Sequence, residues 1–77
     1  MTTNKKFNEN VGSFLNEYRK NHGLSRSEID SKMGKGAGWY REIERGRNGL
    51  SFSDAIKLCD ILGIDLNELG DIGNDRN

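Results

Sequence analysis

The chain has 77 residues, 32% of them hydrophobic and 31% charged, and its formal net charge is zero. This length leaves room for one small domain, and no apolar run approaches the ~20 residues of a membrane span or follows the polar start as in a secretory signal. These features exclude a membrane protein, and we expect a soluble chain in the cytoplasm.

The charge is distributed unevenly along the chain. Residues 1–50 carry ten Lys and Arg against six Asp and Glu, whereas residues 51–77 carry two against six. This asymmetry suits a basic working face, although a merely uneven surface has the same composition. Cys59 and His22 are the only residues of their types, which excludes a disulfide framework and a site built on several thiolates.

Two helices are predicted in the first half of the chain. Apolar side chains at helical spacing predict one from about Asn8 to Asn21, ending before Gly23. Ser25 and Glu28 form a capping-box pattern, which predicts a second helix as far as Met33. Residues 1–7 are expected to be a flexible N-terminal arm.

Three further helices are predicted after the Gly34-Lys-Gly36 connection. The third runs from about Ala37 to Arg45 and ends at Gly46. Ser51 starts the fourth, whose core face is predicted to comprise Phe52, Ala55, Ile56, Cys59 and Leu62. Asp65 and Glu68 repeat the capping pattern over a short fifth helix. We therefore expect an all-α domain over residues 8–72 and a flexible tail over 73–77.

Three motifs in this order resemble the lambda-repressor-like family, also called Cro or XRE. They are Gly23-Leu-Ser-Arg-Ser-Glu-Ile-Asp-Ser-Lys-Met-Gly34, Ile43-Glu-Arg-Gly46 and Leu62-Gly-Ile-Asp-Leu-Asn-Glu-Leu69. The resemblance implies a compact five-helix domain with a helix-turn-helix at helices two and three. The third helix would enter the DNA major groove and the second would brace across the backbone. It also implies a buried ion pair between Arg19 and Glu44.

The resemblance implies a phosphate contact by Arg26, and further cations, Lys35, Arg41, Arg45 and Arg47, gather on the same predicted face. Asn48 either donates to phosphate or caps the loop. Ala37 and Gly38 stand where the family usually has long polar side chains, so contact by Ala37 is limited to a thymine methyl group.

Discrimination between bases then passes to Arg41, which suits guanine, or Glu42, which suits cytosine. Trp39 packs either on DNA or on neighbouring helices. Two residues depart from the family pattern. Asp30 stands at a helix crossing where Ala is usual and needs a partner, Lys32 or the amides near Lys35, and Gly36 replaces a capping Ser or Thr.

The sequence favours a transcriptional regulator, most simply a repressor of bacterial or phage type, that binds a near-palindromic operator in double-stranded DNA as a homodimer. No constellation for catalysis, a metal, a cofactor or a small-molecule ligand is recognisable, so no enzyme is expected. The candidate dimer residues are apolar and lie near the C-terminus: Ile61, Ile64, Leu66, Leu69 and Ile72. Some of them must serve the core instead. The alternative is a protein-binding module such as an antitoxin, antirepressor or accessory subunit.

Overall fold

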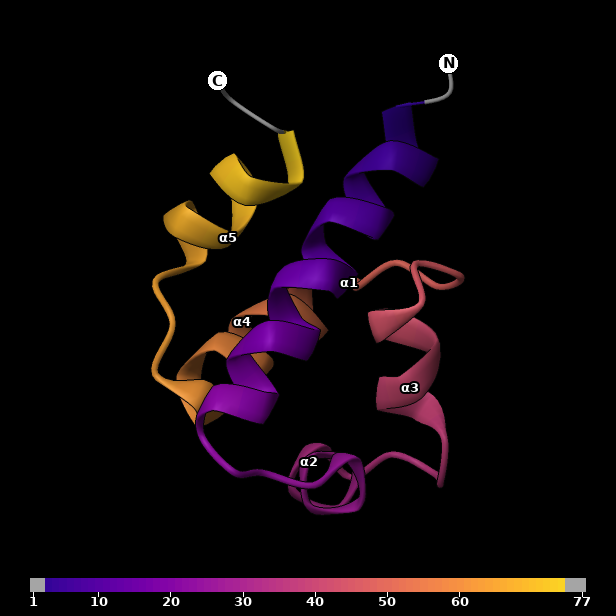
Figure 1. Ribbon diagram of the computed structural model, residues 1–77, viewed down its shortest axis with the longest axis vertical. Coiled ribbons are helices and arrows are strands. Elements are labelled where there is room, and N and C mark those ends of the chain that lie inside the picture. Colours follow the sequence, from indigo (N-terminus) through magenta and orange to yellow (C-terminus); the bar gives the residue numbers. More distant parts are fainter. Residues whose placement is uncertain (1–2, 75–77) are drawn as a thin grey trace.

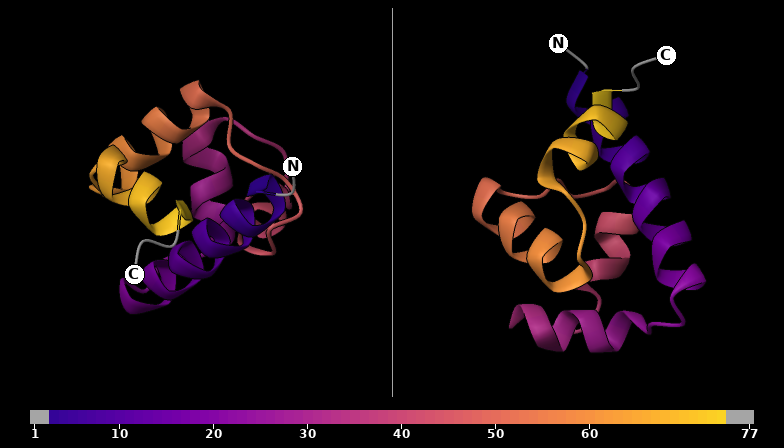
Figure 2. Two further views of the ribbon diagram at one scale, coloured as in Figure 1. Left: turned by 90° about the horizontal axis from the view of Figure 1, so that it is seen from above. Right: turned by 90° about the vertical axis from the view of Figure 1, so that its left-hand side faces the viewer.

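The structure, a computed structural model, describes residues 3–74, and all their regular secondary structure is helical. The helices are α1 (Thr3–Asn21), α2 (Arg26–Met33), α3 (Trp39–Glu44), α4 (Phe52–Leu62) and α5 (Leu66–Asn74). α1 runs along the molecule and packs on α5 and α3, while α2 lies across the end opposite the two termini (Figures 1 and 2). None of these helices has the length and apolar character needed to cross a bilayer. The predicted all-α, five-helix fold is confirmed.

The ends of the domain differ from the prediction. α1 begins at Thr3, so residues 3–7, expected to belong to an arm, are helical. The Phe7 ring packs so closely against Gly73 that a Cβ there would overlap it, and the Asn10 side-chain amide donates to the Gly73 carbonyl at 3.0 Å. These contacts hold the first turns of α1 against the end of α5, which extends through Asn74. The remaining residues of the predicted arm and tail, 1–2 and 75–77, lie outside the described residues.

Local capping signals explain where α2 and α4 begin. The Ser25 hydroxyl accepts from the Glu28 amide at 3.0 Å, and the Ser25 amide donates to the Glu28 carboxylate at 2.9 Å. This reciprocal pair is the predicted capping box, and it satisfies two amides that the first helical turn leaves unpaired. At α4, the Ser51 hydroxyl accepts from the Asp54 amide at 3.1 Å.

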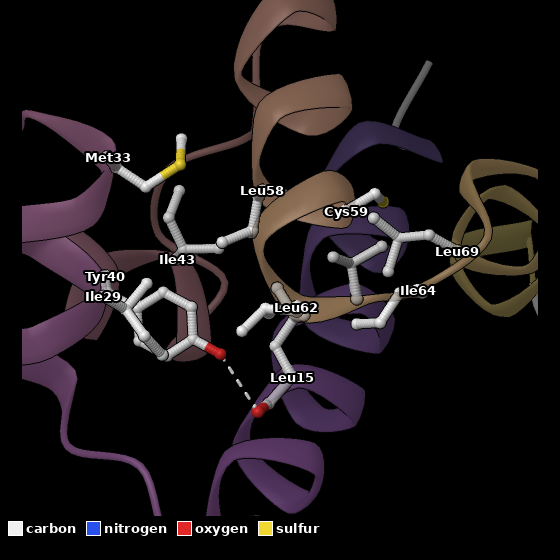
Figure 3. Close-up of a cluster of buried hydrophobic side chains, with 11 residues drawn as sticks. Leu15, Ile29, Met33, Tyr40, Ile43, Leu58, Cys59, Leu62, Ile64 and Leu69 are labelled. Atoms are coloured by element: carbon white, nitrogen blue, oxygen red, sulfur yellow. Dashed lines mark hydrogen bonds between the residues drawn. The ribbon is translucent and has the colours of Figure 1, made fainter.

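A single hydrophobic core joins all five helices (Figure 3). Its buried members are Val11, Leu15, Ile29, Met33, Tyr40, Ile43, Leu58, Cys59, Leu62, Ile64 and Leu69. The Tyr40 hydroxyl donates to the Leu15 carbonyl at 3.1 Å, which ties α3 to α1 inside the core. Burial raises the pKa of Tyr40, and the nearby Glu44 carboxylate raises it further.

The predicted core face of α4 is wrong at two positions. Phe52 is 75% exposed and Ile56 is 45% exposed, although both follow the helical spacing of buried residues. α4 instead turns Leu58, Cys59 and Leu62 into the core. The buried residues of α4 lie in its later turns, whereas the side of its first turns that carries Phe52 and Ile56 stays open to solvent.

Candidate nucleic-acid interface

The connection between α2 and α3 is made by a glycine-rich turn. Gly34 ends α2 in the left-handed conformation with φ of 71°, and Gly38 precedes α3 with φ of 90°. A residue with this φ cannot continue a right-handed helix, so α3 begins at Trp39 and not at Ala37 as predicted. Ala37 and Gly38 therefore belong to the turn, and α3 has only six residues.

Asp30 supplies the N-terminal cap that the turn itself lacks. Its side chain is buried, and its two carboxylate oxygens accept from the Gly38 amide at 3.0 Å and the Tyr40 amide at 2.8 Å. Gly36 offers no side-chain oxygen for this purpose. Two amides at the start of α3 therefore compensate the charge of Asp30. The partners considered from sequence were Lys32 and the amides near Lys35.

Polar and small residues of α2, the turn and α3 line one shallow groove. The groove is lined by Arg26, Ser27, Asp30, Ser31, Lys35, Ala37, Gly38 and Arg41. The side chains of Arg26, Lys35 and Arg41 are 47%, 33% and 53% exposed. Arg26 and Arg41 are therefore exposed, and Lys35 is partly exposed, around a depression whose lining includes the Asp30 carboxylate, which accepts from backbone amides. Such a surface attracts a polyanion.

Lys35 and Trp39 contact each other at the edge of this groove. The Lys35 ammonium lies 3.2 Å from the Asp54 carboxylate and 5.4 Å from the centroid of the Trp39 ring. Trp39 is partly buried and packs against the core. Trp39 thus packs on neighbouring helices, one of the two roles considered for it, and its contact with DNA stays a prediction.

The cations after the groove are arranged around Glu42. Its carboxylate lies 3.9 Å from Arg41 Nε and 3.8 Å from Arg47 Nη1, distances that give only weak ion pairs on a surface. Arg45 is exposed at the C-cap of α3. Residues 25–48 together carry six Lys and Arg and four Asp and Glu. The helix-turn-helix segment is thus net positive.

A model of a helix-turn-helix domain family matches residues 10–71, which includes every element of this surface. The chain belongs to this helix-turn-helix family. Comparison with curated proteins and with solved structures found no significant match. The family match and the five-helix architecture together support the lambda-repressor-like fold expected from the sequence.

Behind the helix-turn-helix surface, Glu44 joins three helices. One carboxylate oxygen accepts from Arg19 Nε at 2.8 Å, and the other accepts from Arg26 Nε at 2.8 Å. The Glu44 side chain is 4% exposed and that of Arg19 12%. The sequence suggested the pairing with Arg19, but the second bond, to Arg26, had no sequence signal.

Asn48 lies away from the groove of the helix-turn-helix. It lines a separate apolar pocket of about 350 Å³ with residues of α1, α4 and α5, among them Phe7, Phe52 and Leu66. Two groove residues, Ser27 and Ser31, were missed from sequence. The sequence could have indicated them, because they are polar residues one helical turn apart on α2 and lie next to Arg26.

Some of the apolar residues suggested for a dimer are buried in the structure, and the others are partly exposed. Ile64 and Leu69 are 8% and 4% exposed and belong to the core, so they are not available to a partner. Ile61, Leu66 and Ile72 are half-buried. Among the described residues, the large apolar side chains that are exposed are instead Phe52 and Ile56 of α4.

Proposed function

We propose that this domain is a sequence-specific DNA-binding transcriptional regulator, a repressor that occupies a near-palindromic operator as a homodimer. The observation that carries the proposal is the groove between α2 and α3, where the solvent-accessible cations Arg26, Lys35 and Arg41 surround the turn of a helix-turn-helix. In this role α3 lies in the major groove and α2 crosses the phosphate backbone.

Contacts to phosphate and to bases fall on different residues in this proposal. Arg26, Lys35, Arg45 and Arg47 contact phosphates, which sets affinity and register. Arg41, at the middle of α3 and more than half exposed, is the proposed reader of guanine. Gly38 lets the backbone approach DNA closely, and Ala37 contributes a contact to a thymine methyl group.

Dimerisation follows from the size of the domain, because one helix-turn-helix covers a half-site and two need to lie about 34 Å apart. Phe52 and Ile56 support a self-association surface, since a pair of large apolar side chains one turn apart is costly to leave in water. Sedimentation of the wild type and of Phe52→Ser over a range of concentrations tests this. A monomer at all concentrations, with and without DNA, contradicts the dimer.

Selection of bound sites from random DNA tests the proposal as a whole. A palindromic consensus that the purified protein shifts in a mobility assay is the expected result. Absence of enrichment, together with no binding at low salt, would overturn DNA binding. The second candidate, a protein-binding module, is favoured by one observation: the two residues before α3, Ala37 and Gly38, carry no side chain able to hydrogen-bond a base edge.

A further inference from the structure

Glu44 is shared between two arginines whose surroundings differ. Its two oxygens each accept one bond of 2.8 Å from an Nε atom, that of Arg19 on α1 and that of Arg26 on α2. The carboxylate itself is nearly inaccessible to solvent. One buried acceptor therefore fixes the positions of two guanidinium groups.

Arg19 has its other nitrogens occupied. Its Nη1 donates to the Leu24 carbonyl at 3.1 Å and its Nη2 donates to the Asn16 side chain at 3.2 Å. Three of its five N–H groups are thus used, and with only 12% of the side chain exposed Arg19 is poorly accessible to a ligand. Its role is to neutralise and hold Glu44.

Arg26 is held at one point only. Within residues 5–74, whose side chains are described, Nε is the only nitrogen of Arg26 with a hydrogen-bond or ion-pair partner, and the side chain is 47% exposed. A guanidinium is a rigid planar fork, so anchoring Nε fixes the direction in which the two terminal nitrogens point. Arg26 also lines the groove beside Arg41 and Lys35. The free end of the fork is thus a bidentate donor for an oxyanion.

We propose that Glu44 is a positioning residue for DNA binding: it orients Arg26 so that the two terminal nitrogens meet a backbone phosphate. This inference rests on the proposed DNA-binding function. The triad of two arginines and one glutamate keeps one net positive charge, because Arg19 compensates the carboxylate and leaves the charge of Arg26 for the phosphate. The contact consequently depends on the packing of α1, α2 and α3 at one carboxylate.

A consequence separates this arrangement from a simple surface charge. A lysine has one ammonium group and no rigid fork, so it cannot hold Glu44 and present a directed pair of donors to phosphate together. At a position where only charge matters, lysine replaces arginine with little loss. Arg47, which is 64% exposed, only loosely paired with Glu42 and proposed as a phosphate contact, provides the comparison.

The test compares Arg26→Lys, Arg26→Gln, Arg47→Lys and Arg47→Gln for binding to a random-sequence duplex over a range of salt concentrations. Arg26→Lys and Arg26→Gln are both expected to weaken binding about tenfold and to lower the salt slope by about 0.9, the value of one phosphate contact. At Arg47, where the proposed phosphate contact depends on charge alone, Arg47→Gln is expected to lower the salt slope by about 0.9 and Arg47→Lys to restore it. Wild-type affinity in Arg26→Lys, or equal losses in the two lysine variants, would overturn the positioning role.

A second measurement distinguishes orientation from stability. On a selected binding site, single phosphates are replaced by neutral methylphosphonates one at a time. One replacement in each half-site is expected to weaken the wild type and to leave Arg26→Lys unaffected, a pattern that altered folding does not produce. The same sensitivity in both proteins contradicts the inference. If the wild type itself binds no DNA, the proposed function fails first, and the two failures are thus distinguished.

Discussion

The Asp30 carboxylate on α2 accepts a hydrogen bond of 2.8 Å from the amide of Tyr40 on α3. The other carboxylate oxygen accepts from the Gly38 amide, so Asp30→Ala leaves both amides without their acceptor in a largely buried setting. We expect a loss of about 2–3 kcal/mol in the free energy of unfolding, measured by urea denaturation. Asp30→Asn keeps one acceptor oxygen and is expected to lose less. Equal stability of Asp30→Ala and the wild type contradicts the cap.

Two glycines with opposite surroundings provide a matched pair. A Cβ at Gly12 would lie 2.5 Å from the Glu44 carbonyl oxygen and would also overlap the Ile43 carbonyl, so Gly12→Ala forces α1 and α3 apart. We expect the free energy of unfolding to fall by about 1–3 kcal/mol, the typical cost of overpacking. At Gly70, inside α5, nothing lies within 4 Å of the added carbon, and Gly70→Ala is expected to gain about 0.5–1 kcal/mol. Thermal melting of both variants checks the opposite signs.

Glu44 and Glu42 lie on the same short helix but differ in burial. Glu44→Ala strands the nearly buried Arg19, and we expect it to cost about 3–5 kcal/mol. Glu42→Ala removes only exposed pairs of 3.8 Å and 3.9 Å and is expected to change stability by less than about 1 kcal/mol. An unmoved melting temperature in Glu44→Ala would show that the pair with Arg19 contributes no stability.

The capping box of α2 predicts a pH dependence. Hydrogen bonds from the Ser25 amide and then from its hydroxyl lower the pKa of Glu28 below its ordinary value. The folded state therefore prefers the carboxylate, and this contribution is present above the unfolded pKa of about 4.3 and disappears as the pH falls through the folded pKa. We expect Glu28→Gln to be less stable than the wild type at pH 7 and equally stable in acid. A difference independent of pH contradicts this assignment.

Arg41 and Arg45 separate specificity from affinity if α3 enters the major groove. Arg41→Ala is expected to relax the preference at one base pair by about 1–3 kcal/mol. Arg45→Ala is expected to weaken binding to all sequences alike and to reduce the salt slope by about 0.9. Competition assays with single-base variants of a selected site measure both effects. Loss of base preference in Arg45→Ala would reverse the two roles.

Features that depend on nearby residues were predicted well from the sequence. The number and order of the helices, the capping box at Ser25 and the stop at Gly34 follow from local hydrogen bonding and backbone preference. The start of α3 did not follow in this way. The helix start depends on the hydrogen bond from the Gly38 amide to the Asp30 carboxylate, eight residues earlier, and on the positive φ of Gly38. From sequence alone, a glycine at this position is also compatible with a helix.

Periodicity alone also cannot show which side of a helix finds neighbours. Phe52 and Ile56 share the spacing of core residues, but among the described residues they stay 75% and 45% exposed. The second arginine on Glu44 was invisible for a related reason. Arg26 and Glu44 are far apart in the sequence, and only the packing of α2 against α3 brings them to 2.8 Å.

The late start of α3 limits what the proposed operator can encode. Six residues rise only about 9 Å along a helix axis, which is less than three base-pair steps of about 3.4 Å. Each half-site then offers few positions for direct discrimination. Selectivity would have to come from combining two half-sites at a fixed spacing and from the ease with which the intervening duplex bends or twists.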